Sequence, residues 1–210
     1  EELGRAFPGQ RVVASSGAHV IAEVAPTPAI VVATPGAEPW PSGGYAAVVL
    51  LDVSTMLAAP GLRAGEQAMR RWFNAAALVR PGGRVVVAAS NDVPQVQALV
   101  RWSPRWFAER ELATRTETGM PPAVRMVELV GTPAELEQVV EHLANLPTQA
   151  HAALTILGPV PISEQDRSLL ITVPHRWAKV VLAHVRADLV TRSAERRPTL
   201  SIRVDPVDLR

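Results

Sequence analysis

Hydrophobic runs and helical stretches alternate over the first ninety residues of the chain. Short runs rich in β-branched residues and bounded by Gly or Pro predict strands at Arg11–Ala14, Ala29–Thr34, Ala46–Asp52 and Arg84–Ser90. The unbroken apolar run from Ala46 to Leu51 predicts a strand that is buried on both faces, as in a parallel sheet covered by helices. Strands separated by helices indicate an α/β layer.

Helices are predicted between and after these strands. Leu62–Val79 is preceded by Pro60-Gly61 and followed by Pro81-Gly82-Gly83, which are start and stop signals. Residues 91–118 read as helical throughout, with prolines at plausible first-turn positions. Three aromatic rings occur there, and we interpret them as anchors of the helices to the sheet: Trp102, Trp106 and Phe107.

The segment Gly119-Met120-Pro121-Pro122 predicts a domain boundary, because two successive prolines cannot continue a helix. After it the pattern predicts, in order, strand Ala123–Val130, helix Pro133–Leu146, strand Leu154–Leu157, strand Arg167–Val173, helix Arg176–Val190 and strand Leu200–Val204. The order β-α-β-β-α-β is that of the split βαβ, or ferredoxin-like, arrangement. The expected fold class is therefore α/β followed by α+β.

Composition narrows the chemistry that this chain can carry. Its 210 residues allow one large domain or two small ones. It has no cysteine, which excludes a disulfide scaffold, a thiol nucleophile and a thiolate metal site within these residues. The five histidines share no ligand spacing, so we expect no metal site. No apolar run is long enough to span a membrane, and we expect no membrane partner.

Common catalytic motifs are missing. The sequence has neither a G-x-x-x-x-G-K-[ST] loop nor a G-x-G-x-x-G loop after a strand, and no serine stands in a G-x-S-x-G elbow. The segment Leu78–Val87 does resemble the helix-to-strand turn of class I S-adenosylmethionine methyltransferases. That family also needs a glycine-rich loop after its first strand, which this chain lacks. A Rossmann-like methyltransferase is kept as an alternative.

The formal net charge of +1 conceals two basic stretches. Residues 167–203 contain eight basic and two acidic residues, and residues 63–115 contain nine arginines and four acidic residues. Such stretches fit local contact with phosphates, although solvated helix faces would give the same pattern. Trp177, beside Arg176 and Lys179, is either a stacking surface for single-stranded bases or part of the core.

Several separated segments, in matching order and spacing, resemble one family. They are Glu2-Leu3, Phe7-Pro8-Gly9, Tyr45, Leu50-Leu51-Asp52, Arg63-Ala64, Glu66, Val96–Leu99, Phe107–Arg115, Pro121-Pro122, Leu157-Gly158-Pro159-Val160-Pro161 and Val204-Asp205-Pro206. The last two blocks are the most specific. The chain resembles the C-terminal part of the primosomal protein N′ family, the replication-restart helicases called PriA.

The resemblance implies an architecture. Residues 1–118 would be a second RecA-like helicase lobe that lacks its start, and residues 119–210 would be the family's C-terminal domain. The family is an ATP-dependent 3′–5′ DNA helicase. Its zinc, and its ATP if retained, would bind on the N-terminal side of Glu1, so no cofactor is expected in this chain.

The chain departs from the family in its arginine-finger block. Where family helicases carry Gln-Val-Ala-Gly-Arg-Ala-Gly-Arg, this chain reads from Asn74 to Arg80, and Leu78 occupies the position of the first arginine. An arginine finger places positive charge on the transferring phosphoryl group, which leucine cannot do, and Arg80 alone does not rebuild the block. We therefore expect a degenerate lobe without ATP-driven unwinding, as in actinobacterial members. The composition of twenty arginines and one lysine agrees.

The expected function is a DNA-binding, primosome-assembly role in replication restart, with links to DNA repair and recombination. The protein would recognise stalled or branched forks and help reload the replicative helicase. The expected DNA contacts are Arg167, Arg176, Trp177, Lys179 and Arg203. Expected partners are branched and single-stranded DNA, the acidic tail of single-strand-binding protein and other primosome proteins, in the cytoplasm near the nucleoid. A protein docking module is a further alternative.

Overall fold

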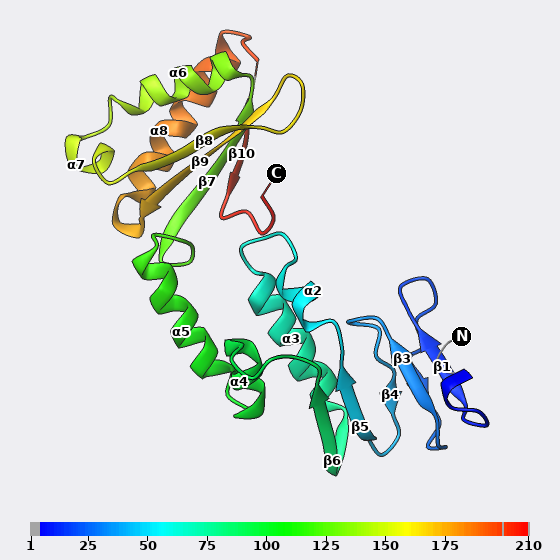
Figure 1. The fold of residues 1–210 in the computed structure, drawn as a ribbon. Helices are drawn as coiled ribbons and strands as arrows, with labels where there is room; N and C mark the ends of the chain where they lie inside the picture. The colour runs from blue at the N-terminus through cyan, green and yellow to red at the C-terminus, as the bar shows by residue number, and fades with distance from the viewer. Residues whose placement is uncertain (1–4, 199, 210) are drawn as a thin grey trace. The chain divides into compact units, whose positions relative to one another are not determined.

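The computed structural model describes residues 5–198 and 200–209, and the chain divides into two compact units (Figure 1). The first unit is Glu1–Pro104 and the second is Arg105–Arg210. Helix α5 (Pro104–Glu117) thus belongs almost entirely to the second unit, whereas the sequence pattern places the boundary after it, at Gly119–Pro122. Each unit has its own hydrophobic core.

In the first unit the described strands form three separate parallel pairs. The pairs are β1 (Val12–Ser15) with β3 (Ile30–Ala33), β2 (Glu23–Val24) with β4 (Trp40–Pro41), and β5 (Tyr45–Leu50) with β6 (Val79–Val87). Parallel pairing agrees with an α/β layer. The pairs do not join into one continuous sheet over the part of this unit that the structure describes.

The helices packed beside these strands are α2 (Val53–Leu57), α3 (Ala64–Ala77) and α4 (Pro94–Val100). The core between them and β5 consists of Leu50, Val53, Ala68, Trp72, Ala75, Ala76, Val96 and Leu99. Helix α3 ends at Ala77, two residues earlier than predicted, because the carbonyl of Leu78 accepts a 2.8 Å hydrogen bond from Tyr45 N–H. That bond directs the chain into β6 beside β5.

The prediction that Ala46–Leu51 is buried on both faces is wrong. Leu50 is buried and Val48 packs against the helical core, but Val49 and Leu51 are 56% and 62% exposed. Side chains alternate between the two faces of a strand, so these exposures separate an inner face from an outer one. Among the described strands β5 pairs with β6 alone. An apolar run therefore indicated a strand here without indicating what covers it.

The second unit contains the predicted β-α-β-β-α-β order. Its elements are β7 (Val124–Gly131), α6 (Pro133–Leu143), the short α7 (Thr148–His151), β8 (Thr155–Pro161), β9 (Arg167–Pro174), α8 (His175–Ala194) and β10 (Ser201–Val204). The strand order is β10-β7-β9-β8, and every neighbouring pair is antiparallel. Strand β9 thus lies between β7 and β8, as the split βαβ arrangement requires.

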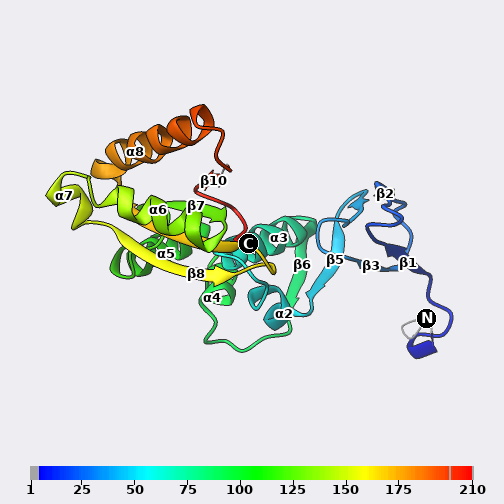
Figure 2. The same cartoon turned by 90° about the horizontal axis from the view of Figure 1, so that it is seen from above.

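Helices α6 and α8 contribute to one core with the sheet (Figures 1 and 2). The core includes Val127 and Leu129 of β7, Ile171 of β9, Leu136 of α6 and Val181 of α8, all 1% exposed or less. Alternate residues of each strand therefore face the helices. A capping box starts α6: Thr132 Oγ1 accepts from Glu135 N–H, and Glu135 Oε2 accepts from Thr132 N–H at 2.7 Å.

Strand β8 forms one edge of this sheet and is irregular. Its pairing with β9 shifts register between Leu157 and Val160. Gly158 lies in the shift with φ +103°, and a Cβ atom added there would lie 2.9 Å from the carbonyl oxygen of Ser168. The block from Leu157 to Pro161, which carries much of the family resemblance, is therefore needed for the shape of this edge.

Candidate nucleic-acid interface

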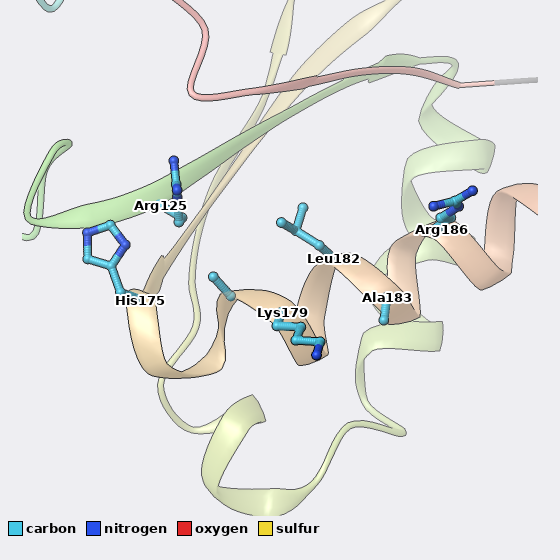
Figure 3. Close-up of a pocket in the computed structure, with 7 residues that line it drawn as sticks. Arg125, His175, Lys179, Leu182, Ala183 and Arg186 are labelled. Atoms are coloured by element: carbon cyan, nitrogen blue, oxygen red, sulfur yellow. The ribbon is translucent and has the colours of Figure 1, made fainter.

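One face of α8 presents basic side chains around an open hollow of about 540 Å³ (Figure 3). The residues that line it are Arg125, His175, Ala178, Lys179, Leu182, Ala183 and Arg186. The helical period brings these α8 residues to one side, since side chains three, four, seven and eight positions apart share a face. At a rise of 1.5 Å per residue, His175 and Arg186 lie about 16 Å apart along the helix. None of the lining residues is acidic.

Two contacts hold the edge of this hollow in place. His175 Nε2 lies 2.8 Å from the carbonyl oxygen of Pro122 and donates a hydrogen bond to it, since a carbonyl oxygen can only accept. Arg125 forms an ion pair with Asp205, whose carboxylate also accepts a 3.0 Å hydrogen bond from Met126 N–H. The Val-Asp-Pro block near the end of the chain thus positions a cation of the hollow.

Two of the predicted DNA contacts lie at this surface. Arg176 and Lys179 are exposed, and they stand three residues apart in the first turns of α8. Lys179 lines the hollow and Arg176 is adjacent to the lining residue His175. Within residues 5–198 and 200–209, no hydrogen bond or ion pair engages the side chain of Arg176, Lys179 or Arg186. Their charges are therefore available to an external anion.

The other three predicted contacts are used inside the domain. Arg167, at the start of β9, donates to the carbonyl oxygens of Ser163 and Asp166 and so closes the β8–β9 loop. Trp177 is partly buried and packs against the core, which is the second of the two roles that the sequence left open for it. Arg203 on β10 pairs with Glu128, whose side chain is completely buried. The geometry does not bring these three side chains to the hollow.

The two degenerate ATPase positions lie in the first unit. Leu78 is the residue between α3 and β6, and Arg80 is exposed near the start of β6. In parallel α/β sheets, ligands bind at the carboxyl ends of the strands. Leu78 and Arg80 are at the amino end of β6, so neither is placed for such a site.

Sequence reasoning did not select as contacts three of the four basic residues that line the hollow: Arg125, His175 and Arg186. Two of them lie on the helix that carries Lys179, and counting helical intervals from Lys179 reaches both of them. Arg125 joins from β7, fifty positions before His175, and only the sheet topology reveals its place.

No group of three or more His, Cys, Asp or Glu side chains that could bind a metal occurs in the described part of the chain. Likewise, none of its described helices combines the length and apolar character of a membrane span.

Comparison with known proteins is consistent across the chain. Residues 116–207 match the model of the primosomal protein N C-terminal domain. A probable replication restart protein PriA of Mycobacterium leprae is 40% identical over 225 residues, covering 100% of this chain and 34% of that protein. The protein of the same name from Mycobacterium tuberculosis is 48% identical over 165 residues, covering 77% of this chain and 25% of that protein.

The chain therefore spans about a third or less of the length of these relatives. The family match covers most of the second unit, which includes the sheet, α6, α8 and the basic hollow. The relatives extend the similarity into the first unit, because one of them aligns over the whole chain. The chain thus belongs to the PriA replication-restart family and corresponds to a C-terminal part of its members.

Proposed function

We propose that this chain is a DNA-binding part of a replication-restart protein, which recognises stalled or branched forks and helps reload the replicative helicase. In this proposal residues 1–118 derive from a second RecA-like helicase lobe, and residues 119–210 form the domain that contacts DNA. The observation that carries the proposal is the basic hollow on α8, which lies in the region that matches the family's C-terminal domain.

The hollow has the properties of a phosphate-binding surface. Lys179 and Arg186 supply charges that no described side chain neutralises, while Arg125, which pairs with Asp205, and His175 border the hollow on the side of β7. The backbone of one DNA strand carries a phosphate every 3.4 Å along the duplex axis. A row of about 16 Å between His175 and Arg186 therefore faces several successive phosphates. Contacts of this kind are independent of base sequence and weaken as salt rises.

We propose further that the chain does not drive unwinding itself. Leu78 replaces the arginine that would stabilise the transferring phosphoryl group, and Arg80 alone, near the start of β6, does not rebuild the block. The chain would then act by binding DNA and other proteins of the primosome. The acidic tail of single-strand-binding protein is a suitable second ligand for the hollow, because Leu182 and Ala183 add an apolar floor between the cations.

Fork binding tests this proposal directly. The double variant Lys179→Gln/Arg186→Gln removes two charges of the hollow and leaves the core residues of α8 unchanged. Titration of a labelled fork DNA, followed by fluorescence anisotropy over a range of salt concentrations, gives the salt dependence of the binding constant. The plot of log K against log salt has a negative slope, and each lost phosphate contact makes it shallower by about 0.9. The double variant is therefore expected to make the slope shallower by about 1.8.

The matched control is Arg105→Gln, which removes an arginine whose side chain is 87% exposed on α5. It should leave fork affinity and salt slope close to those of the unaltered chain. If the double variant behaves like this control, the hollow is not the DNA site. If the unaltered chain binds no fork DNA at all, the proposed function itself is wrong, and a protein docking module becomes the better description.

No structural observation favours the methyltransferase alternative. Pro81-Gly82-Gly83 does break the regular pairing: the register of β5 against β6 passes from Tyr45↔Val79 to Ala47↔Arg84, and Gly82 has φ +77°. This irregularity lies at the amino-terminal end of β6. A ligand of an α/β sheet would bind at the opposite end of the strands.

A further inference from the structure

Helix α4 ends in a backbone motif that normally requires glycine, but a tryptophan occupies the position. Trp102 N–H donates to the carbonyl of Leu99 at 3.0 Å, and Ser103 N–H donates to the carbonyl of Ala98 at 2.9 Å. These two bonds define a Schellman motif whose left-handed residue is Trp102, with φ +52°. A bulky side chain rarely adopts this conformation, whereas glycine adopts it freely.

Burial of the Trp102 ring does not compensate for this backbone strain. The residue is 57% exposed, and its ring meets Phe73 of α3 at a centroid distance of 4.9 Å and an angle of 55°. Trp106 is partly buried and Phe107 is buried, whereas the anchoring role was predicted for all three rings. Trp102 differs from both, because most of its surface faces solvent. Strained residues that packing does not explain are concentrated at binding sites.

Two exposed arginines lie on the segments that carry the two rings. Arg101 precedes Trp102 and donates to Gln97 Oε1, and Arg70 stands one helical turn before Phe73 on α3, with a side chain that is 70% exposed. Arg70 pairs with Glu66 at 3.1 Å, and an ion pair between two exposed side chains is weak enough to give way to a phosphate. An aromatic ring beside arginines is the usual composition of a surface that stacks unpaired bases and tracks their backbone.

We propose that Trp102 is a stacking platform for an unpaired base of single-stranded DNA. This contact lies in the first unit and is separate from the hollow on α8. It rests on the proposed function, because it gives single-stranded DNA at a fork a second contact on the same chain. Val100, two residues before Trp102, is also 70% exposed and adds apolar surface to this segment.

Replacement by glycine separates this role from a structural one. Trp102→Gly supplies the residue that the left-handed position favours, so the melting temperature is expected to stay unchanged or to rise by about 2–4 °C. The affinity for an oligothymidylate is expected to fall about tenfold, because one base then loses its aromatic stacking partner. Trp102→Phe keeps an aromatic face and should recover part of that loss.

Trp40→Ala is the matched control, because Trp40 is an equally exposed tryptophan of the same unit, at 63%. It should leave oligothymidylate affinity unchanged. Quenching of tryptophan fluorescence by bound oligothymidylate is a second readout, which can be measured at saturation and does not depend on a change in affinity. The quenching should be smaller in Trp102→Phe and unchanged in Trp40→Phe. Unchanged affinity in Trp102→Gly, or unchanged quenching in Trp102→Phe, overturns the proposal.

The two proposals fail in distinguishable ways. An unaltered chain that binds neither fork nor single-stranded DNA contradicts the proposed function and the stacking contact with it. An unaltered chain that binds both, with Trp102→Gly equal to it, contradicts only the stacking contact. A fall in melting temperature of more than about 5 °C in Trp102→Gly would assign the ring a packing role and would also overturn the inference.

Discussion

The salt bridge between Asp188 and Arg192 of α8 gives the sharpest test of the core of the second unit. Arg192 is 1% exposed, and its Nε donates to Asp188 Oδ2 at 2.6 Å while a terminal nitrogen donates to the carbonyl of Glu135 at 3.2 Å. Asp188→Asn keeps the shape of the side chain but leaves the guanidinium buried without a counter-charge. Breaking one partner of a buried pair costs about 3–5 kcal/mol. We expect about 3 kcal/mol, the lower end, because the Glu135 carbonyl still accepts from Arg192.

Urea unfolding followed by far-ultraviolet circular dichroism measures this loss as a lower midpoint with an unchanged slope. The apolar double variant Asp188→Leu/Arg192→Met should recover at least half of it, because no uncompensated charge then remains. His142→Gln is the control: His142 Nδ1 lies 3.5 Å from Asp188 Oδ1, but its side chain is 39% exposed, and we expect less than about 1 kcal/mol. The reasoning would be refuted if Asp188→Asn lowered the free energy of unfolding by less than about 1 kcal/mol. It would also be refuted if Asp188→Leu/Arg192→Met were as unstable as the sum of the losses from Asp188→Leu and Arg192→Met made singly.

Two further predictions concern a turn and a phenol. Gly158→Ala should lower the free energy of unfolding by at least about 2 kcal/mol in urea titrations, because it places a Cβ at φ +103° and 2.9 Å from the Ser168 oxygen. Gly17→Ala is the control, since a Cβ there meets nothing within 4 Å, and it should leave stability unchanged. Equal losses in the two variants would contradict the assignment. Burial, and next the charge of Glu38, raise the pKa of Tyr45 above its ordinary value of 10.0. Because the folded pKa is above the unfolded one, the associated stability is complete below pH 10.0 and is lost as pH rises through the folded pKa. Ultraviolet titration of this single tyrosine should show a midpoint above pH 10.0, and Glu38→Gln should lower that midpoint only in part, because burial remains. A midpoint at pH 10.0 in the unaltered chain would contradict this prediction.

The sequence predicted the second unit well because its signals are local. Alternation along β7 and β9, the helical period of α6 and the prolines that separate elements all act within a few residues. The first unit was harder, since an apolar run such as Ala46–Leu51 does not report how many strands or helices cover it. The outer face of β5 depends on neighbours that local patterns do not specify.

The basic surface was predicted only in part, for a related reason. The sequence alone does not distinguish a charged side chain that faces solvent from one that pairs with a buried partner. Arg192 and Arg203 both counted toward the basic stretch, yet one pairs with Asp188 four residues away and the other with Glu128 seventy-five residues away. The second pairing follows from the register of β10 against β7, in which Arg203 stands opposite Glu128. The charge that remains outside is therefore smaller than the count suggests, and it is concentrated on α8.

The irregular edge at β8 has a consequence for how the protein behaves at high concentration. An open strand edge offers unpaired N–H and C=O groups on which a second molecule can add a strand. Pro159 and Pro161 remove two donors from the seven residues of β8, and the register shift between Leu157 and Val160 breaks the regular spacing of the others. This edge is thus a poor template for polymerisation, so a high local concentration of the protein does not favour aggregation through β8.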